Sequence, residues 1–178
     1  MFNNNIYNSY NENFETPILI NNLLIYIKSA NHIKDNIYLG DWNSSCNKIF
    51  LTKKNIKCII CLAMCKKPQN IIDLYKKLNI KYYHIFIDDN IQENILQYFN
   101  KCIKIIKNNK NNNNNILIHC QAGVSRSASI VIAYIMKEKK LNFNDAFKIV
   151  SEKRYIINPN EGFKFQLLKW NNIKNLYN

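Results

Sequence analysis

The chain has 178 residues, of which 47% are hydrophobic, and a formal net charge of +13 at pH 7. This length fits one domain with a sizeable core, and the composition predicts a soluble globular protein. The Lys and Arg residues are interspersed with Asn and Ile and form no long block. The charge therefore favours a solvated surface and argues against a specific nucleic-acid or membrane site.

Features that would direct the chain to a membrane or out of the cell are not found in the sequence. Its first residues, MFNNNIYNSYNENFE, do not form a basic segment followed by an apolar one, as a signal peptide would. No run of 18 apolar residues predicts a membrane span, and position 2 is not the Gly that N-myristoylation needs. We therefore expect a cytoplasmic protein, present in the nucleus as an alternative, with free thiols. The cysteines are Cys46, Cys58, Cys61, Cys65, Cys102 and Cys120.

The first 30 residues are expected to form an extension of the main domain, which we place at 31–176. Residues 1–14 are rich in Asn and are predicted to be disordered. Residues 17–30 carry apolar side chains at helical spacing, which predicts an accessory helix. Packing of this helix on the domain is favoured, and binding of a partner stays open.

Segments with strand and helix patterns alternate along the rest of the chain. Strands are predicted at 36–40, 57–63, 81–87 and 116–119. Helices are predicted at 47–55, 68–78, 92–107, 127–139, 144–154 and 160–176. The tract 108–115 holds seven Asn and one Lys and is predicted to be a low-complexity loop. This order predicts an α/β fold with a central, mainly parallel sheet of four to five strands flanked by helices.

Three closely spaced cysteines are a candidate metal site. Cys58, Cys61 and Cys65 are spaced as C-x2-C-x3-C, but the first two lie in an apolar run that reads as a strand. No second pair of ligands follows downstream, as a structural zinc site requires. We therefore expect neither a metal nor another cofactor.

The segment ILIHCQAGVSRSASIVI, residues 116–132, places a Cys and an Arg between a predicted strand and a predicted helix. Backbone N–H groups converge at such a helix N-terminus and bind anions such as phosphate. Gly123 permits the backbone angles that such a loop needs, and the guanidinium of Arg126 matches two phosphate oxygens. The predicted phosphate-binding residues are Gln121, Ala122, Gly123, Val124, Ser125 and Arg126.

Cys120 is the candidate nucleophile of this loop. A thiol beside such positive groups is largely thiolate at neutral pH and is poised to attack phosphorus. The Ser127 hydroxyl is placed to bind the sulfur when it leaves, and His119 is expected to orient the loop. A carboxylic acid must also protonate the departing oxygen, and a carboxylate must then activate water. Asp88 and Asp89 are the candidates, and plain turn capping is the alternative role for both.

The residues from His119 to Ser127 resemble HCxxGxxRS, the signature of the cysteine-dependent protein tyrosine phosphatase superfamily. The longer form HCQAGVSRSAS resembles that of the small, atypical dual-specificity protein phosphatases. Further similar blocks are IYLGDWNSS at 37–45, NIKCIICLA at 55–63 and RYIINPNEGFKFQL at 154–167. The resemblance covers roughly residues 33–170 and implies the cysteine-phosphatase fold. It also implies a catalytic domain that hydrolyses phosphotyrosine, phosphoserine and phosphothreonine through a cysteinyl-phosphate intermediate.

The resemblance also assigns roles to single residues. Cys120 matches the nucleophile, Arg126 the phosphate clamp and Ser127 the hydroxyl that assists departure of the thiolate. Asp89 matches the general acid, because it lies nine residues before Tyr98, as the acid of the family does before an aromatic residue. Asp88 stays the alternative acid.

The position of Cys61 differs from the family pattern, which usually has Asn there. The favoured interpretation is a small buried side chain, and the alternative is a thiol that forms a reversible disulfide with Cys120 after oxidation. Phosphoprotein substrates and a monomeric chain are expected. The rival functions are hydrolysis of a phosphoinositide, an RNA 5′-phosphate or a glucan phosphate, and a non-catalytic module that binds phosphorylated residues.

Overall fold

The computed structural model of the chain describes residues 15–20 and 23–174, with side chains described from Lys28 onward. Its strands are β1 (Glu15–Ile20), β2 (Leu23–Lys28), β3 (Ala30–Lys34), β4 (Ile37–Gly40), β5 (Ile56–Leu62), β6 (Lys81–Ile85) and β7 (Asn115–His119). Its helices are α1 (Trp42–Cys46), α2 (Lys48–Lys53), α3 (Gln69–Lys77), α4 (Leu96–Asn111), α5 (Arg126–Glu138), α6 (Phe143–Lys153) and α7 (Glu161–Ile173).

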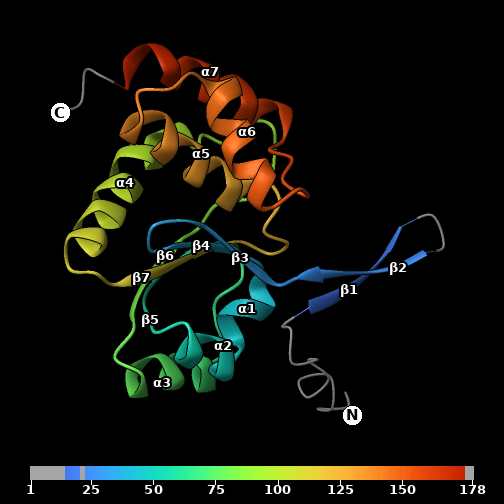
Figure 1. Ribbon diagram of the computed structural model, residues 1–178, viewed down its shortest axis with the longest axis vertical. Coiled ribbons are helices and arrows are strands. Elements are labelled where there is room, and N and C mark those ends of the chain that lie inside the picture. The colour runs from blue at the N-terminus through green and yellow to red at the C-terminus, as the bar shows by residue number, and fades with distance from the viewer. Residues whose placement is uncertain (1–14, 21–22, 175–178) are drawn as a thin grey trace.

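The central sheet has five strands in the order β3-β4-β7-β5-β6. The pairs β4–β7, β7–β5 and β5–β6 are parallel, and the edge strand β3 is antiparallel to β4. Helices α4–α7 cover one face of the sheet, and α1–α3 cover the other (Figure 1). The predicted α/β fold with a mainly parallel sheet is confirmed.

Successive residues of the central strands enter opposite cores, because side chains alternate between the faces of a sheet. On β7, Ile116 and Ile118 belong to the core under α4–α7, and Leu117 belongs to the core beside α2 and α3. Burial on both faces explains the unbroken apolar runs of β5 and β7. Helix α5 is buried along nearly all of its length and fixes the start of the loop before it.

The N-terminal extension does not form the predicted accessory helix. Strands β1 and β2 pair with each other in an antiparallel two-stranded sheet, which is separate from the central sheet (Figure 1). The run PILINNLLIYI is apolar at nearly every position, so the spacing of its apolar residues does not separate a helix from strands. The predicted disorder of 1–14 lies outside the described residues, and the division at 30/31 stays a prediction.

The Asn-rich tract is only partly a loop. Helix α4 continues to Asn111 and β7 begins at Asn115, so the expected loop over 108–115 is wrong at both ends. Buried Asn109 explains the longer helix: its side-chain amide donates to the carbonyl of Ile105 (2.8 Å), and its backbone carbonyl accepts from the N–H of Asn114 (3.0 Å). Tertiary burial therefore overrides the weak helix propensity of Asn.

Candidate active site

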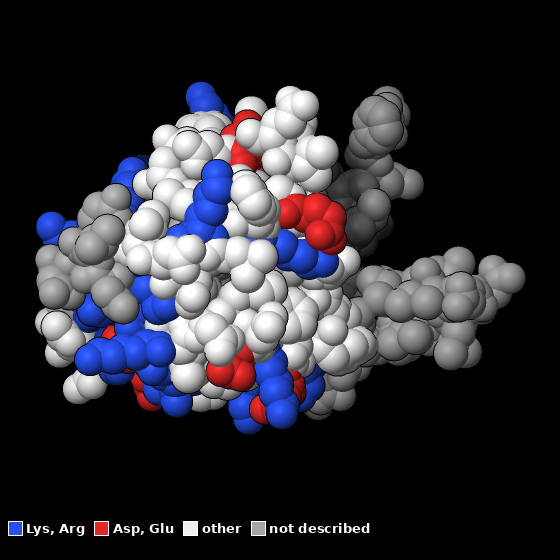
Figure 2. Space-filling model, turned by 90° about the horizontal axis from the view of Figure 1, so that it is seen from above, with Lys and Arg blue, Asp and Glu red and all other residues white. Residues whose placement is uncertain are grey.

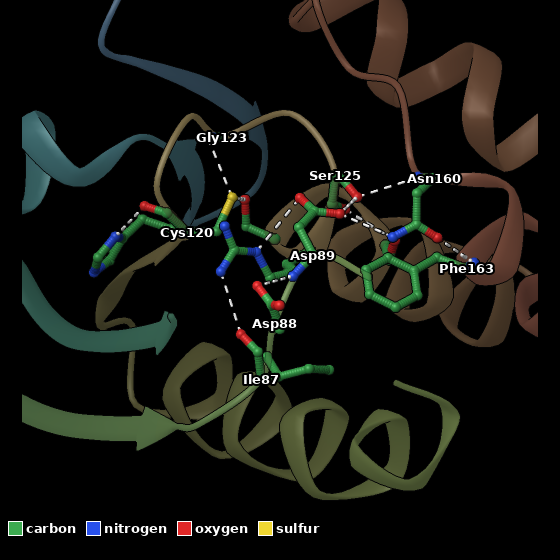
Figure 3. A network of polar contacts seen from close by, with 12 residues as sticks. Ile87, Asp88, Asp89, Cys120, Gly123, Ser125, Asn160 and Phe163 are labelled. Carbon is green, nitrogen blue, oxygen red and sulfur yellow. Dashed lines mark hydrogen bonds and ion pairs between the residues drawn. The ribbon is translucent and has the colours of Figure 1, made fainter. Parts of the chain in front are cut away.

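The site lies where β7 ends and α5 begins, at the carboxyl edge of the parallel strands. Cys120 directly follows the buried strand β7 and is almost completely buried, at 1% exposure. Its Sγ accepts a hydrogen bond from the backbone N–H of Gly123 (3.2 Å; Figure 3) and another from the Ser127 hydroxyl (3.2 Å). Both donors stabilise negative charge on the sulfur.

The loop of residues 120–126 is held from outside by its carbonyl groups. Four successive carbonyls each accept a hydrogen bond from a group outside the loop. The pairs are Trp42 N–H to Gln121 (3.0 Å), the Arg154 side chain to Ala122 (3.2 Å) and Gly123 (2.9 Å), and Asn158 N–H to Val124 (2.9 Å). In a planar trans peptide the N–H points opposite to the C=O, so these bonds turn the following N–H groups toward the inside. The loop therefore presents a ring of donors to an anion above the sulfur.

Gly123 meets the sequence expectation of an unusual backbone conformation. Its φ is +69°, in the left-handed region that favours glycine. A Cβ at this position would lie 2.6 Å from the carbonyl oxygen of Gly40 and 2.8 Å from Nη2 of Arg154. Larger residues are therefore excluded on two independent grounds.

Arg126 and Asp89 meet at the mouth of this loop. The Arg126 side chain donates through Nη1 to the carbonyl of Ile87 (3.2 Å), and its Nε lies 3.5 Å from Oδ2 of Asp89. The other oxygen of Asp89, Oδ1, accepts from the Ser125 hydroxyl (2.6 Å) and from the side-chain amide of Asn160 (2.8 Å). Figure 3 shows the Asp89 carboxylate between Ser125 and Asn160. A carboxyl group thus lies beside a buried guanidinium and is hydrogen-bonded to the loop that carries the thiol.

Asp88 lies outside this arrangement. Its carboxylate accepts a hydrogen bond from the backbone N–H of Asp89 (2.8 Å), which is the capping role that the sequence analysis left open. The geometry therefore favours Asp89 over Asp88 as the acid.

His119 is completely buried below the loop. Its Nδ1 lies 2.9 Å from the carbonyl oxygen of Cys120, so Nδ1 carries the proton that it donates. Burial, and then the positive charge of Lys67, lower the pKa of His119 to about 3. The imidazole is therefore neutral at physiological pH and is hydrogen-bonded to the first residue of the loop, and its role in orienting the loop stays a prediction.

Lys67 and Trp42 form a support that the sequence analysis did not identify. The buried ammonium of Lys67 lies 3.2 Å from the centre of the Trp42 ring and also donates to the Ser45 hydroxyl. The Trp42 ring stands edge-on to His119, with ring centres 6.1 Å apart. A cation over an aromatic face is attracted by the ring, so Lys67 fixes the residue whose N–H holds the Gln121 carbonyl. A lone Lys before a Pro gives no sequence signal for this role.

Cys61 lies on β5, paired in register with His119 on the neighbouring strand β7. It is buried and reduced, and burial raises the pKa of its thiol. This agrees with the favoured interpretation of a small buried side chain, and the disulfide with Cys120 stays a prediction. Among the described residues no group of three or more His, Cys, Asp or Glu side chains is arranged to hold a metal ion.

Comparisons with known proteins give the context of this geometry. Residues 37–173 match the family described as dual specificity phosphatase, catalytic domain. A protein of Amsacta moorei entomopoxvirus named as a tyrosine-protein phosphatase is 44% identical over 154 residues, which cover 83% of this chain and 90% of that protein. A probable rhodanese domain-containing dual specificity protein phosphatase of Dictyostelium discoideum is 38% identical over 135 residues. The match covers 76% of this chain and only 27% of that relative.

Solved structures share the same fold. The human tyrosine phosphatase-like serine/threonine/tyrosine-interacting protein superposes with a TM-score of 0.71 at 31% identity. The superposition covers 81% of this chain and 96% of that structure. The described part of the chain also contains no helix with the length and apolar character of a membrane span.

Proposed function

Because the chain belongs to the dual specificity phosphatase catalytic-domain family, we propose that it hydrolyses phosphate monoesters of proteins through a cysteinyl-phosphate intermediate. The observation that carries the proposal is the arrangement around one sulfur. Cys120 accepts two hydrogen bonds below a ring of N–H groups, and Arg126 and Asp89 meet at the mouth of the ring. A nucleophile, an anion site and an acid are the parts that phosphoryl transfer to a thiol requires.

In the first step the Cys120 thiolate attacks phosphorus. The S–P bond forms while the bond from phosphorus to the ester oxygen breaks. The loop N–H groups and the Arg126 guanidinium hold the remaining phosphoryl oxygens, and these donors are in place before charge develops. The departing oxygen takes the proton of the Asp89 carboxyl, which avoids release of a poor alkoxide or phenoxide.

In the second step water attacks the cysteinyl phosphate. The Asp89 carboxylate accepts a proton from the water, the S–P bond breaks and inorganic phosphate leaves. The Ser127 hydroxyl, 3.2 Å from the sulfur, stabilises the thiolate as it departs. The proton balance closes, since Asp89 regains the proton that it donated.

Phosphotyrosine and phosphoserine or phosphothreonine residues are the proposed substrates. Support comes from the relatives, which are named as dual specificity or tyrosine phosphatases. The charge of the loop also supports a single phosphate monoester, because none of its variable positions is Lys. The rival functions are a phosphatase that acts on phosphoinositides, RNA or glucans, and a non-catalytic module that binds phosphorylated residues. The binding module agrees with the "phosphatase-like" name of the human structure.

We further propose that the protein is a monomer and needs no cofactor. Its proposed location is the cytoplasm, with the nucleus as the alternative. The six cysteines are free, which is compatible with a reducing compartment.

Hydrolysis of a generic aryl phosphate tests the proposed chemistry. We expect turnover that vanadate inhibits and a chelator does not affect, and we expect Cys120→Ser to abolish it. A panel of phosphopeptides, phosphoinositides, RNA 5′-phosphates and glucan phosphates then separates the substrate classes.

For Asp89→Asn we expect roughly 100-fold lower kcat with an alkyl phosphate and a smaller loss with a good leaving group. The matched variant Asp88→Asn retains activity with both substrates, and full activity of Cys120→Ser would refute the mechanism.

A further inference from the structure

Large hydrophobic side chains gather on the loops around the phosphate site. Seven such residues are strongly exposed among the residues with described side chains. Four of them lie on three loops that border the site, at 63–68, 86–95 and 154–160. These four, here called the apolar rim, are Met64, Phe86, Ile91 and Tyr155, and they are 49–69% exposed. Single exposed hydrophobic residues are common on protein surfaces, whereas several of them around one site indicate a binding surface.

Two rim residues are fixed through His84. Nε2 of His84 lies 2.8 Å from the carbonyl oxygen of Ala63, the residue before Met64. The Phe86 ring stacks on the His84 ring, with centres 4.0 Å apart and planes inclined by 27°. Phe86 also precedes Ile87, whose carbonyl accepts from Arg126. His84 therefore links the backbone next to Met64 with the ring of Phe86, and Phe86 precedes the residue that binds the phosphate clamp.

The other two rim residues come shortly after Asp89 and Arg154 in the sequence. Ile91 lies two residues after Asp89, and its backbone packs so closely on Gly162 that a Cβ there would collide with the Ile91 carbonyl. Tyr155 follows Arg154, whose guanidinium holds the carbonyl groups of the phosphate loop. Both positions are thus built into the rigid frame of the site.

The charge beside the rim is not that of a polyanion site. On the three rim loops and the phosphate loop, Lys67, Arg126 and Arg154 are buried, and Lys66 is the exposed basic residue. Asp88 and Asp89 are exposed on the same surface. The net charge of +13 therefore arises elsewhere, and Figure 2 shows Lys and Arg in separate groups with Asp and Glu between them. A ligand around the phosphate loop meets apolar side chains and little exposed positive charge.

We propose that the apolar rim binds large apolar side chains on either side of the phosphorylated residue in a phosphopeptide. This inference rests on the proposed phosphatase function and names a substrate class for it. The occupant follows from continuity, because a polypeptide whose phosphate enters the loop must pass over the rim. Burial of one large apolar side chain against the rim raises kcat/KM by about tenfold.

The test compares two phosphotyrosine peptides that differ only in the two residues flanking the phosphotyrosine, Leu in one and Ser in the other. Wild-type protein should give a kcat/KM about tenfold higher for the Leu peptide. Phe86→Ser and Met64→Ser should each bring this ratio toward one, and Ile49→Ser, on an exposed position of α2, should keep it. With an aryl phosphate too small to reach the rim, Ile49→Ser should match the wild type.

Three results would overturn the proposal. Equal kcat/KM for the two peptides in the wild type would remove the preference, and a ratio unchanged in Phe86→Ser and Met64→Ser would place it outside the rim. Cosedimentation of the wild type with phosphatidylcholine–phosphatidylserine vesicles, lost in Phe86→Ser, would assign the rim to a membrane surface. Absence of aryl phosphate turnover in the wild type would instead refute the proposed function itself, and the inference with it.

Discussion

The side-chain amide of Asn160 donates a 2.8 Å hydrogen bond to the carboxylate of Asp89, a residue 71 positions earlier in the chain. The same Asn160 caps α7, because its Oδ1 accepts from the N–H of Phe163 (2.9 Å). The Ser125 hydroxyl donates to the Asp89 oxygen as well. The start of α7 and the phosphate loop together therefore set the direction of the proposed acid.

We predict that Asn160→Ala lowers kcat for an alkyl phosphate roughly tenfold, because one of the hydrogen bonds that hold the Asp89 carboxyl group in place is lost. The matched control is Asn142→Ala, which removes the equivalent cap of α6, the 3.0 Å bond to the N–H of Asp145. Each variant should lose about 1 kcal/mol of unfolding free energy in urea. Equal loss of kcat in both variants would show that capping alone is responsible.

Arg154 connects the phosphate loop with the N-terminal segment. Besides the loop carbonyls it donates to the carbonyl of Lys28 (2.8 Å) and to Oδ1 of Asn31 (2.7 Å). Arg154→Lys keeps the charge but cannot bridge these groups, because a single ammonium replaces the planar fork. We expect roughly tenfold weaker inhibition by vanadate, and exposed Lys153→Ala should show none of this loss. Unchanged vanadate inhibition in Arg154→Lys would contradict the role of Arg154.

His119 predicts a pH dependence of stability. Its pKa is lowered to about 3 in the folded protein, and its ordinary value is 6.5. Between pH 3 and 6.5 the His119 side chain is protonated in the unfolded chain but not in the folded protein. The contribution of His119 to the free energy of unfolding is therefore fully present above pH 6.5 and is lost as the pH falls toward 3. Urea unfolding at pH 7 and pH 5 should show a loss of stability that is about 2 kcal/mol larger in the wild type than in His119→Asn. An equal loss in both proteins would mean that His119 is charged in the folded state.

Oxidation tests the alternative role of Cys61. If its thiol reaches Cys120, mild peroxide first converts the Cys120 thiolate to a sulfenic acid. Cys61 then displaces water and forms the disulfide. We predict a Cys61–Cys120 peptide in mass spectra and recovery of activity with a thiol reductant. Cys61→Ser should recover less, and Cys58→Ser is the control on the same strand. If no such peptide forms, Cys61 is a structural residue only.

The strands in the middle of the sheet were predictable because they are buried on both faces. The apolar runs of β5 and β7 follow from that burial, and the phosphate loop follows from one short motif. The N-terminal hairpin was missed because its apolar run fits either element. Helix α1 was missed because it has only five residues, although Asp41 is a recognisable N-cap that accepts from Ser44 N–H (2.8 Å).

The site was predictable where its residues are neighbours in sequence, and not where distant elements meet. Cys120, Arg126 and Ser127 share one motif, whereas Asp89 was singled out by spacing within a resemblance. The supports at Trp42, Lys67, Arg154 and Asn160 act through contacts across the fold. No periodicity or local spacing in the sequence encodes such contacts.

The central claim is that Cys120 carries the phosphoryl group during turnover. The most direct measurement is mass spectrometry of the protein denatured rapidly during steady-state hydrolysis of an aryl phosphate. The account predicts one phosphate on the peptide that contains Cys120, with more of it in Asp89→Asn, where hydrolysis of the intermediate is slow. Phosphate on another residue, or turnover without a phosphorylated Cys120 in either protein, would contradict it.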